Sequence, residues 1–556
     1  MFGAVLVWLI LGPFAIFAPL GYIDPWYYPG YFRDFSYLLL HRGFTYYVSR
    51  LPWIVPGRIA FSILNPELAS LLLCACIVTV SAFCLYSMVR WYYGRTPAIL
   101  AALALITNAY FMGAAGWPYP DGAAIAYAMV ALALYLRPQG SRGWNGFWAA
   151  AALTLSACTN LAAGPMIASV LVVPIWRWRH SRKELLRQAL CAVAGVAITT
   201  LVLSVVSKRM LGDARVFQPQ FDMMMYTVRH PGYLSGRYGS GPGFLLSSVR
   251  VFMPVFLLAL GPALLTLGRK LSPIARPAYL ALLTCFSLYM FQELALGRPS
   301  LRVHYVSSYI MVVVAGFAGV VVGELWNSVK TSRMSETAAA LSLGAVAVVV
   351  PYLCQLWGPM ANYPGFVWGL LAAIGLAAIV LAILVRRLQS PVQYVALALV
   401  LLGISISPAM DLQITWGIDQ ESLHGTNLSG RSRATGFQCL TKLQDYIKSN
   451  LKMEQDVAFW WDGDEPLTNL YASTASIFVS KYLDLTKEMQ ANSGRLYPGN
   501  TTVVHLTEYP ELLAERRRIL NARGLDVTNE RRVGMSYAGQ QFIVVMQDLT
   551  ELKGLP

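Results

Sequence analysis

Charged side chains are scarce in this sequence. Asp, Glu, Lys and Arg make up 13% of its 556 residues, and long stretches such as Ala98 to Phe111 and Leu190 to Val206 contain none of them. A water-soluble chain of this length needs far more charge on its surface, so the scarcity excludes an ordinary soluble protein. With 56% hydrophobic residues and a mean hydropathy of +0.51, the composition indicates an integral membrane protein.

Clusters of metal-ligating residues are missing as well. The six histidines are isolated from one another, at His41, His180, His230, His304, His424 and His505. Seven of the eight cysteines lie in or beside hydrophobic runs, and Cys439 is the only one in the C-terminal region. The sequence therefore predicts neither a zinc site nor a disulfide within that region.

What the chain has instead is a series of long apolar runs. A membrane-crossing helix needs about 17–25 mostly apolar residues, because each backbone amide inside the bilayer must be paired within the helix. By this criterion the sequence predicts a polytopic α-helical membrane protein with about 13 transmembrane helices. They are expected at 3–20, 67–89, 97–113, 122–136, 144–158, 161–176, 188–206, 250–268, 277–294, 304–325, 337–357, 365–385 and 392–409.

Basic residues fall in alternate short loops and so predict the orientation. Lys and Arg are retained on the cytoplasmic side during insertion, and one set of loops carries pairs such as Arg90 with Arg95 and Arg386 with Arg387. The loops 21–66 and 207–249 then lie on the outer side together with the C-terminal region. The net charge of +15 follows largely from the cytoplasmic loops, so we expect the bilayer as a partner and no nucleic acid.

The C-terminal region has the composition of a soluble domain. We expect a transmembrane domain over 1–409, a polar linker over 410–436 and an extracytoplasmic α/β or α+β domain over 437–556. Helices are expected near 437–451, 477–491 and 509–523, and strands at DVAFWWDG, TTVVHL and GQQFIVVMQDL. An aromatic and acidic cluster at one strand end favours solvated carboxylates over a sugar site, and comprises Trp460, Trp461, Asp462, Asp464 and Glu465.

The first outer loop, 21–66, carries the richest chemistry. Phe32, Phe35, Leu38 and Leu39 recur at helical spacing with charged residues on the other side, which predicts an amphipathic helix lying flat on the lipid. The rest of the loop is crowded with Tyr, Trp and Arg, which suits a surface that meets lipid headgroups or stacks on a sugar ring.

Two carboxylates are placed where predicted spans meet the outer surface. Asp24 follows the first span, and Asp121 opens the fourth span in the sequence GWPYPDG. If these helices pack together, both carboxylates could face one cavity, where they could take a proton from a hydroxyl or hold a divalent cation. The alternative is helix capping, since Asp24 precedes Pro25 and Asp121 stands where a cap belongs.

Cationic and aromatic residues are numerous on the predicted outer side. An anionic lipid headgroup needs Arg, Lys or His at the membrane surface, and contact with bulk lipid headgroups is the alternative for each of them. The candidates for holding a phosphate are Arg33, Arg42, Arg50, Arg58, Lys208, Arg209, Arg237, Arg302 and His304. The candidates for binding substrate are Asp34, Tyr46, Tyr47, Trp117, Tyr119, Tyr226, Tyr233 and Tyr238, some of which could instead be interfacial anchors.

The order of these features resembles the C structural class of glycosyltransferases (GT-C), in particular bacterial aminoarabinose transferases and protein O-mannosyltransferases. The shared features are an acidic residue directly after the first span, an amphipathic helix, a Tyr-rich stretch ending in Arg50 and Pro52, a Pro-Asp turn before the fourth span, a large loop after the seventh, and an outer C-terminal domain. The resemblance covers the first seven or eight spans. Members often have two adjacent acidic residues after the first span, whereas Pro25 follows Asp24 here, so Asp34 or Asp121 would have to supply the second.

The resemblance implies transfer of a sugar from a polyprenyl-phosphate-linked donor to a glycan, lipid or protein acceptor on the outer face of the bacterial inner (plasma) membrane. Asp24 would act as the general base in an inverting reaction, and Asp121 would orient the acceptor or the base. Arginine alone can stabilise a phosphate leaving group, so no cofactor is required, while a divalent metal stays possible.

A transporter or flippase for a lipid-linked or anionic substrate is the main competing hypothesis. Transporters place ionisable groups and broken helices near the middle of the bilayer. The predicted spans are nearly free of charge, and Glu293, the main exception, lies near an outer end. A glycan polymerase or ligase would share the same membrane architecture, and so would a non-catalytic scaffold whose outer domain binds a partner.

Overall fold

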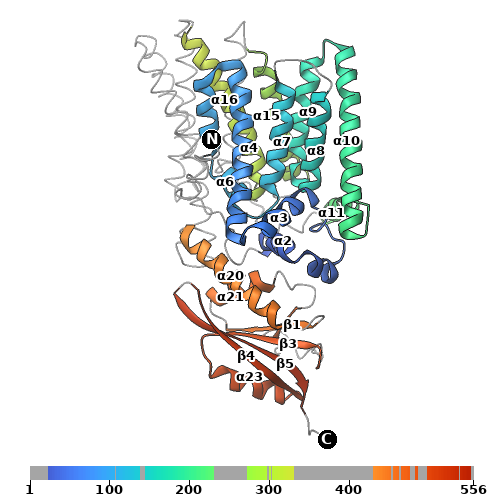
Figure 1. Cartoon of the computed structure of the whole chain (residues 1–556). Helices are drawn as coiled ribbons and strands as arrows, with labels where there is room; N and C mark the ends of the chain where they lie inside the picture. The colour runs from blue at the N-terminus through green and yellow to red at the C-terminus, as the bar shows by residue number, and fades with distance from the viewer. Residues whose placement is uncertain are drawn as a thin grey trace.

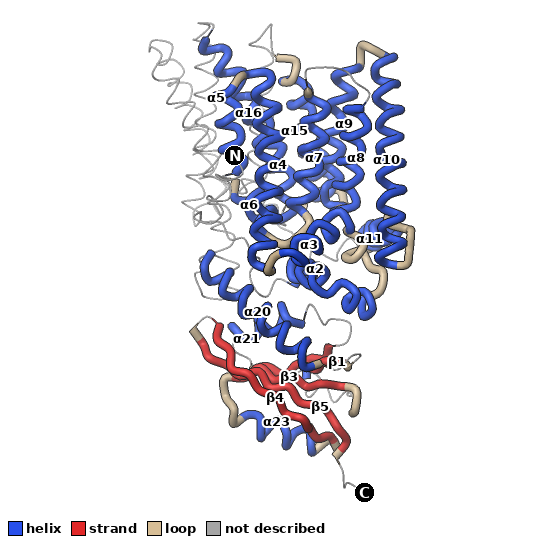
Figure 2. Tube along the Cα trace, viewed as in Figure 1, coloured by secondary structure: helices blue, strands red, loops and turns tan. Residues whose placement is uncertain are grey.

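The computed structural model describes residues 23–106, 108–137, 144–230, 272–296, 300–301, 304–330, 430–451, 455–462, 465–475, 482–485, 498–537 and 539–552. A helical bundle carries the C-terminal domain at one end, which we call the domain end (Figures 1 and 2). The spans predicted at 3–20, 250–268, 337–357, 365–385 and 392–409 lie outside the described residues, as does most of the predicted linker.

Each span predicted within the described residues is helical. The helices are α4 (Pro66–Tyr93), α5 (Arg95–Ile106), α6 (Ala109–Gly116), α7 (Asp121–Leu136), α8 (Trp144–Thr159), α9 (Gly164–Trp178), α10 (Arg182–Leu211), α15 (Ala275–Leu294) and α16 (His304–Lys330). In this part of the chain, four helical stretches are long and apolar enough to cross a membrane unaided: Pro66–Tyr93, Leu161–Trp178, Arg182–Leu211 and Val306–Glu324. The total of about 13 spans stays a prediction.

The span predicted at 97–113 is broken into α5 and α6, which meet at an angle of 65°. Asn108 lies between them, and its side-chain oxygen accepts a hydrogen bond from the backbone N–H of Phe111 at 3.1 Å. An asparagine in this role caps a new helix and interrupts the previous one. The bend brings the turn after α6, and Asp121 behind it, to the domain end of the bundle.

The described part of the loop predicted at 21–66 contains two helices, α2 (Ile23–Arg42) and α3 (Leu51–Ile63). The prediction that the apolar side of α2 lies on lipid is wrong, because Phe32, Phe35 and Leu38 are buried inside the protein. The Phe32 ring packs edge-on against Trp53 of α3, with centroids 5.4 Å apart. The sequence pattern indicated the amphipathic helix but not that α3 would cover its apolar side.

The glycines of α8 and α10 allow these two helices to approach closely. A Cβ atom at Gly195 of α10 would lie 2.3 Å from the carbonyl oxygen of Phe147, and one at Gly146 of α8 would lie 2.6 Å from the Gln188 side chain. The Cβ at Gly146 would also lie 2.8 Å from the Gln188 carbonyl oxygen, and a side chain at either position would displace backbone of the other helix. This approach holds α10 against α8 along one side of the bundle.

The C-terminal domain is a mixed five-stranded sheet with helices on both faces (Figure 1). The strand order is β2-β1-β3-β5-β4, with β1 parallel to β2 and β3, and β5 antiparallel to β3 and β4. The strands are β1 (Asp456–Trp461), β2 (Tyr482–Asp484), β3 (Thr501–Thr507), β4 (Leu525–Tyr537) and β5 (Gln540–Glu551). The helices α20 (Gly430–Asn450) and α21 (Glu465–Ala475) face the bundle, and α23 (Leu512–Asn521) covers the far face.

Two predictions for this domain need correction. Helix α20 begins at Gly430, inside the stretch 410–436 that was predicted to be a linker, and strand β2 interrupts the helix predicted at 477–491. The aromatic and acidic cluster is packed rather than solvated where the structure describes it. Asp462 forms a buried ion pair with Arg516, and the Trp461 ring stacks on Tyr471 at 3.6 Å.

Helix α20 docks on α2 through charged and aromatic contacts. Arg33 pairs with Asp445, and Asp34 pairs with Lys448. Trp26 of α2 stacks on Phe437 of α20, with ring centroids 5.6 Å apart. These three contacts, which we call the α2–α20 contact, join the C-terminal domain to the first loop of the bundle.

Candidate functional site

A buried arginine marks the domain end of the bundle. Arg50 directly precedes α3 and is 2% exposed. Four tyrosine rings surround its guanidinium carbon, with centroids at 4.1 Å for Tyr46, 5.5 Å for Tyr119, 5.6 Å for Tyr28 and 5.7 Å for Tyr47. The Nη1 group also donates to the Tyr28 hydroxyl. We call these five residues the Arg50 cluster.

The guanidinium of Arg50 has no direct ion-pair partner in the described part of the chain, although the charge of Asp121 is close enough to interact with it. No carboxylate there forms an ion pair with Arg50, and its buried Nε has no acceptor. Burial raises the pKa of the Tyr28 phenol well above its ordinary value, although Arg50 opposes the shift, so this phenol is neutral. A buried cation without a direct ion pair is costly. The cluster is therefore a site that an anion would stabilise.

Asp121 lies beside the cluster and is completely buried. It is the first residue of α7 rather than the residue before it, so the capping role considered from the sequence does not describe its side chain. Its Oδ1 accepts a hydrogen bond from Nδ2 of Asn160 at 2.8 Å, and Oδ1 of Asn160 accepts one from the Tyr46 hydroxyl at 3.2 Å. Asn160 thus links the carboxyl group to the ring that lies nearest Arg50.

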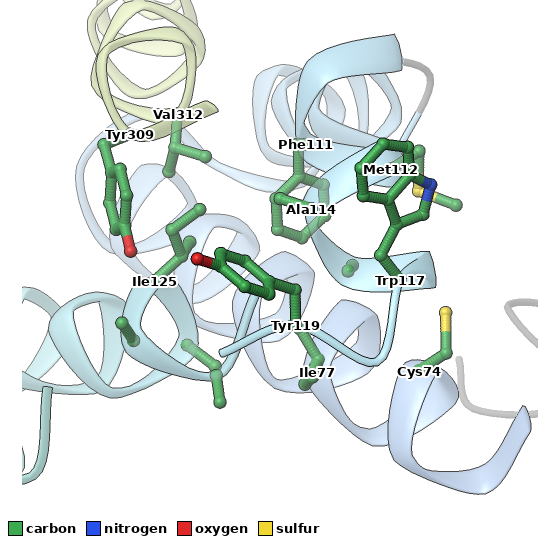
Figure 3. Packing of buried hydrophobic residues seen from close by; sticks show 14 of the residues in the cluster. Cys74, Ile77, Phe111, Met112, Ala114, Trp117, Tyr119, Ile125, Tyr309 and Val312 are labelled. Carbon is green, nitrogen blue, oxygen red and sulfur yellow. The ribbon is translucent and has the colours of Figure 1, made fainter. Parts of the chain in front are cut away.

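The remaining carboxyl oxygen of Asp121 is also buried and accepts no hydrogen bond from the described residues. The phenol of Tyr309, on α16, lies next to this carboxyl group. In the view of Figure 3, the hydroxyl groups of Tyr119 and Tyr309 both point toward the space beside Ile125, one turn into α7. The site therefore combines a buried arginine without a direct ion pair, a buried carboxyl group and several phenols.

Asp24 borders the same cluster from α2. It lies in the first turn of that helix and is partly exposed, four residues before Tyr28 and so on the same side of the helix. Burial raises the pKa of the Tyr47 phenol, and the negative charge of Asp24 raises it further. The structure thus brings Asp24, Arg50 and Asp121 to one region around the Arg50 cluster.

The other predicted phosphate ligands are not gathered here. Arg33 is occupied by Asp445, Arg58 lies over the Phe35 ring at 4.7 Å, and Lys208 donates to the Gly212 carbonyl at the end of α10. Arg209 is exposed on α10. The side chains of Arg42, Arg237, Arg302 and His304 lie outside the described residues.

Some of the predicted substrate-binding residues lie in the Arg50 cluster and others do not. Tyr46, Tyr47 and Tyr119 belong to the Arg50 cluster, whereas Asp34 pairs with Lys448. Trp117 is packed in the core, and Tyr226 of α11 (Gln218–Arg229) stacks on His230, which follows that helix. Tyr233 and Tyr238 lie outside the described residues.

Sequence reasoning missed Tyr28, Asn160 and Tyr309. Tyr28 stands four residues after Asp24 in the aromatic stretch of the first loop, and this spacing could have indicated it. Asn160 stands where two predicted spans meet with almost no loop, an unusual place for a polar residue. Tyr309 gives no signal, because a tyrosine near the end of a span is ordinary.

Within the residues that the structure describes, no group of three His, Cys, Asp or Glu side chains is arranged to hold a metal ion. The site as described offers an arginine for an anion and two separate carboxylates, Asp24 and Asp121. Residues of these types can bind a phosphate and accept a proton.

Comparisons with known proteins gave structural likeness only. No family model and no curated protein matches the sequence. The crystal structure of ArnT from Cupriavidus metallidurans bound to undecaprenyl phosphate is similar to this chain with a TM-score of 0.48 and 16% identity, covering 98% of this chain and 97% of that chain. The same protein in the apo state gives a TM-score of 0.44 and 15% identity over the same shares of the two chains.

Proposed function

We propose that this protein transfers a sugar from a polyprenyl-phosphate-linked donor to an acceptor hydroxyl at the membrane surface. The observation that carries the proposal is the buried guanidinium of Arg50, which forms no direct ion pair in the described part of the chain and has two separate carboxylates nearby. An arginine in a site of low dielectric binds a phosphate strongly, and it stabilises the charge that develops when that phosphate leaves. The order of features that resembles GT-C glycosyltransferases supports the same reaction.

In the proposed reaction, the acceptor oxygen attacks the anomeric carbon as the bond from that carbon to the phosphate oxygen breaks. The bonding electrons leave with the polyprenyl phosphate, whose charge Arg50 stabilises. Asp24 takes the proton of the acceptor hydroxyl, because it is partly exposed and can meet a substrate that arrives from outside. Asp121, held by Asn160, orients the reacting groups. Attack opposite the leaving group inverts the anomeric configuration.

We also propose that the reaction takes place on the outer face, in a bacterial inner membrane, with a glycan, lipid or protein as acceptor. The distribution of basic loop residues supports this orientation. It places the first loop, the Arg50 cluster and the C-terminal domain in the same compartment. Adding a chelator to a transfer assay tests whether a divalent metal binds at the carboxylates.

The test is transfer by the purified full-length protein from polyprenyl-phosphate-linked sugars. We expect Asp24→Asn to lower the turnover number by about 100-fold or more, because a general base contributes at least that much. Arg50→Gln should weaken donor binding as well as turnover. Matched controls are Asp222→Asn on α11 and Arg209→Gln on α10, which should retain the activity of the unmodified protein. Full transfer by a folded Asp24→Asn protein would refute the role of Asp24.

A further inference from the structure

Strand β4 forms one edge of the C-terminal sheet, and no strand of the described residues pairs with its outer side. Its first half is irregular, with a register shift between Thr528 and Arg531 and with Asn529 at a φ of +53°. Irregularities of this kind keep other strands away from a sheet edge. The stretch 533–537 has no such irregularity and no charged residue, so it can pair with a further strand.

A hollow beside this edge leaves room for the side chains of an added strand. It has a volume of about 420 Å³ and lies between α20 and β4. Cys439 and Lys442 line it from α20, and the stretch 533–536 lines it from β4. Val533 and Met535, which alternate with exposed residues along the strand, are half-buried here. The hollow can therefore receive those residues of an added strand that point to the side of α20.

Gly534 stands at the midpoint of the regular segment 531–537, where packing among the described residues does not require a glycine. Its φ is not positive, and a Cβ atom at this position would meet no described atom within 4 Å. Glycine inside a strand lowers stability, and it often marks a place where another backbone approaches closely. Gly534 therefore indicates that a second backbone lies beside β4.

We infer that this edge pairs with the same edge of a second copy of the chain, so that the two sheets join into one. Pairing the strands antiparallel about Gly534 uses the whole segment 531–537 of both copies. This register sets Val533 against Met535 of the second copy on the side of α20. The other opposed pairs contain one charged residue each and so avoid repulsion: Arg531 with Tyr537, and Arg532 with Ser536.

The orientation of the sheet allows this pairing in a membrane. Helices α20 and α21 lie on the face toward the bundle and α23 on the far face, so an axis perpendicular to the sheet runs roughly along the bundle (Figure 1). A twofold axis in that direction relates two antiparallel edge strands. It also leaves both bundles pointing the same way, so both copies can stand in one bilayer.

The register is tested by disulfide formation between copies of the full-length protein in isolated membranes. The exposed native Cys76 and the nearby Cys439 are first replaced by alanine. Directly opposed residues of an antiparallel pair have Cα atoms about 4.5–5.5 Å apart, which suits a disulfide, so Gly534→Cys should cross-link to its own copy on mild oxidation. Ser536→Cys is the matched control. It is also exposed on β4, but its two copies would lie about 13 Å apart along the strands.

We expect a covalent dimer from Gly534→Cys and none from Ser536→Cys or Arg532→Cys alone. Co-expression of Ser536→Cys with Arg532→Cys should restore cross-linking, because these two residues oppose each other in the proposed register. Equal cross-linking of all three single variants would indicate random collision and overturn the inference. So would a Gly534→Cys protein that stays uncross-linked although its thiol reacts with a maleimide, or one that cross-links to a different protein instead.

A second measurement needs no oxidant. Gly534→Asp or Gly534→Lys alone should abolish co-purification of a tagged with an untagged copy, because two like charges would then face each other at the axis. Co-expression of the two variants should restore it. Neither change should alter the unfolding temperature, since a side chain at this position meets open space. Co-purification that persists in each single variant would contradict pairing through this edge.

Discussion

Asn160 has one side-chain amide, and both of its ends are engaged. Its nitrogen donates to Asp121 and its oxygen accepts from Tyr46, so a single residue joins the buried carboxyl group to the ring nearest Arg50. All three residues come from different parts of the chain, and the amide holds them at fixed separations. These two hydrogen bonds hold the Asp121 carboxyl group at a fixed position relative to Tyr46 and so to Arg50.

Asn160→Ala should therefore lower both stability and transfer. The change removes the hydrogen bond that the Asp121 carboxyl group accepts from the amide and takes the acceptor away from the Tyr46 hydroxyl, which costs about 1–3 kcal/mol for each buried group. Thermal unfolding and the transfer assay measure the two effects. The double variant Asp121→Asn/Asn160→Asp exchanges the two side chains and keeps an amide–carboxyl pair. It should therefore be more stable than Asn160→Ala but should not recover activity. Recovery of full activity by the exchange would contradict a specific role for the carboxyl group at position 121.

His505 makes the C-terminal domain sensitive to acid. The buried ring stacks on Trp460 and contacts Gln547 through Nε2 at 3.0 Å. Burial, together with the positive charge of Arg516, lowers the pKa of His505 from 6.5 to about 3. The unfolded chain then binds a proton at a higher pH than the folded one does. Stability should be constant above about pH 6.5 and fall as the pH drops from there toward 3.

The measurement is the free energy of unfolding of the C-terminal domain in the full-length protein at a series of pH values, with unfolding followed by tryptophan fluorescence. His505→Gln keeps a polar group but cannot titrate, so its stability should lose the part of the pH dependence that begins near 6.5. An unchanged pH profile in this variant would show that another group is responsible.

At the scale of elements, the α2–α20 contact joins two helices through two ion pairs. Helix α2 supplies the cation of one pair and the anion of the other. Arg33 and Asp34 on α2 face Asp445 and Lys448 on α20, so only one alignment of the two helices satisfies all four charges. Partly exposed pairs of this kind contribute little stability each, about 0–1 kcal/mol. Their effect is on alignment, and α2 also carries Asp24.

Lys448→Glu should accordingly reduce transfer more than it reduces thermal stability, because it sets two acidic groups against each other where α20 meets α2. Adding Asp34→Lys reverses the pair and should restore activity. Lys442→Glu, on the same helix, serves as the control for the change in charge. If the double reversal stays as inactive as the single variant, the pair does not act through its alignment of α2.

The close approach of α8 and α10 gives a prediction of its own. Gly195→Ala would set a methyl group against the backbone of Phe147, whereas Gly316→Ala on α16 meets nothing within 4 Å. The first change should cost about 1–3 kcal/mol by overpacking, and the second should be neutral or slightly stabilising. Thermal unfolding in detergent distinguishes them. Equal unfolding temperatures would mean that α10 can shift away from α8 without cost.

Features that a local physical requirement imposes on the sequence could be predicted, and contacts between distant segments could not. The apolar runs predicted the helices because a bilayer requires them, and the order of motifs brought attention to Asp24, Arg50 and Asp121. Contacts between segments that are distant in the sequence leave no local pattern. The sequence therefore predicted that Arg33 binds a phosphate and that Asp34 binds substrate, although both side chains pair with residues of α20. Strand β4, with the charged stretch Asn529 to Arg532, was missed because an edge strand need not be apolar.

At the scale of the whole molecule, the orientation in the membrane is the main prediction. If the domain end faces outward, a cysteine introduced at Glu551 should react with a membrane-impermeant maleimide in intact cells, and one at Arg182 should react only after permeabilisation. Replacing the native Cys76 beforehand keeps the signal clean, since it is the exposed cysteine of the described residues. The opposite labelling pattern would invert the whole arrangement and place the Arg50 cluster in the cytoplasm.

The α2–α20 contact also has a consequence for biosynthesis. Arg33 is separated from its partners on α20 by 411 and 412 residues, so α2 leaves the ribosome long before α20 exists. During that interval α2 can pack against α3, but its contacts with α20 have not been made. The alignment of α2, which carries Asp24, would thus be completed only after α20 has been made. A partly made chain inserted in the membrane would remain inactive until then.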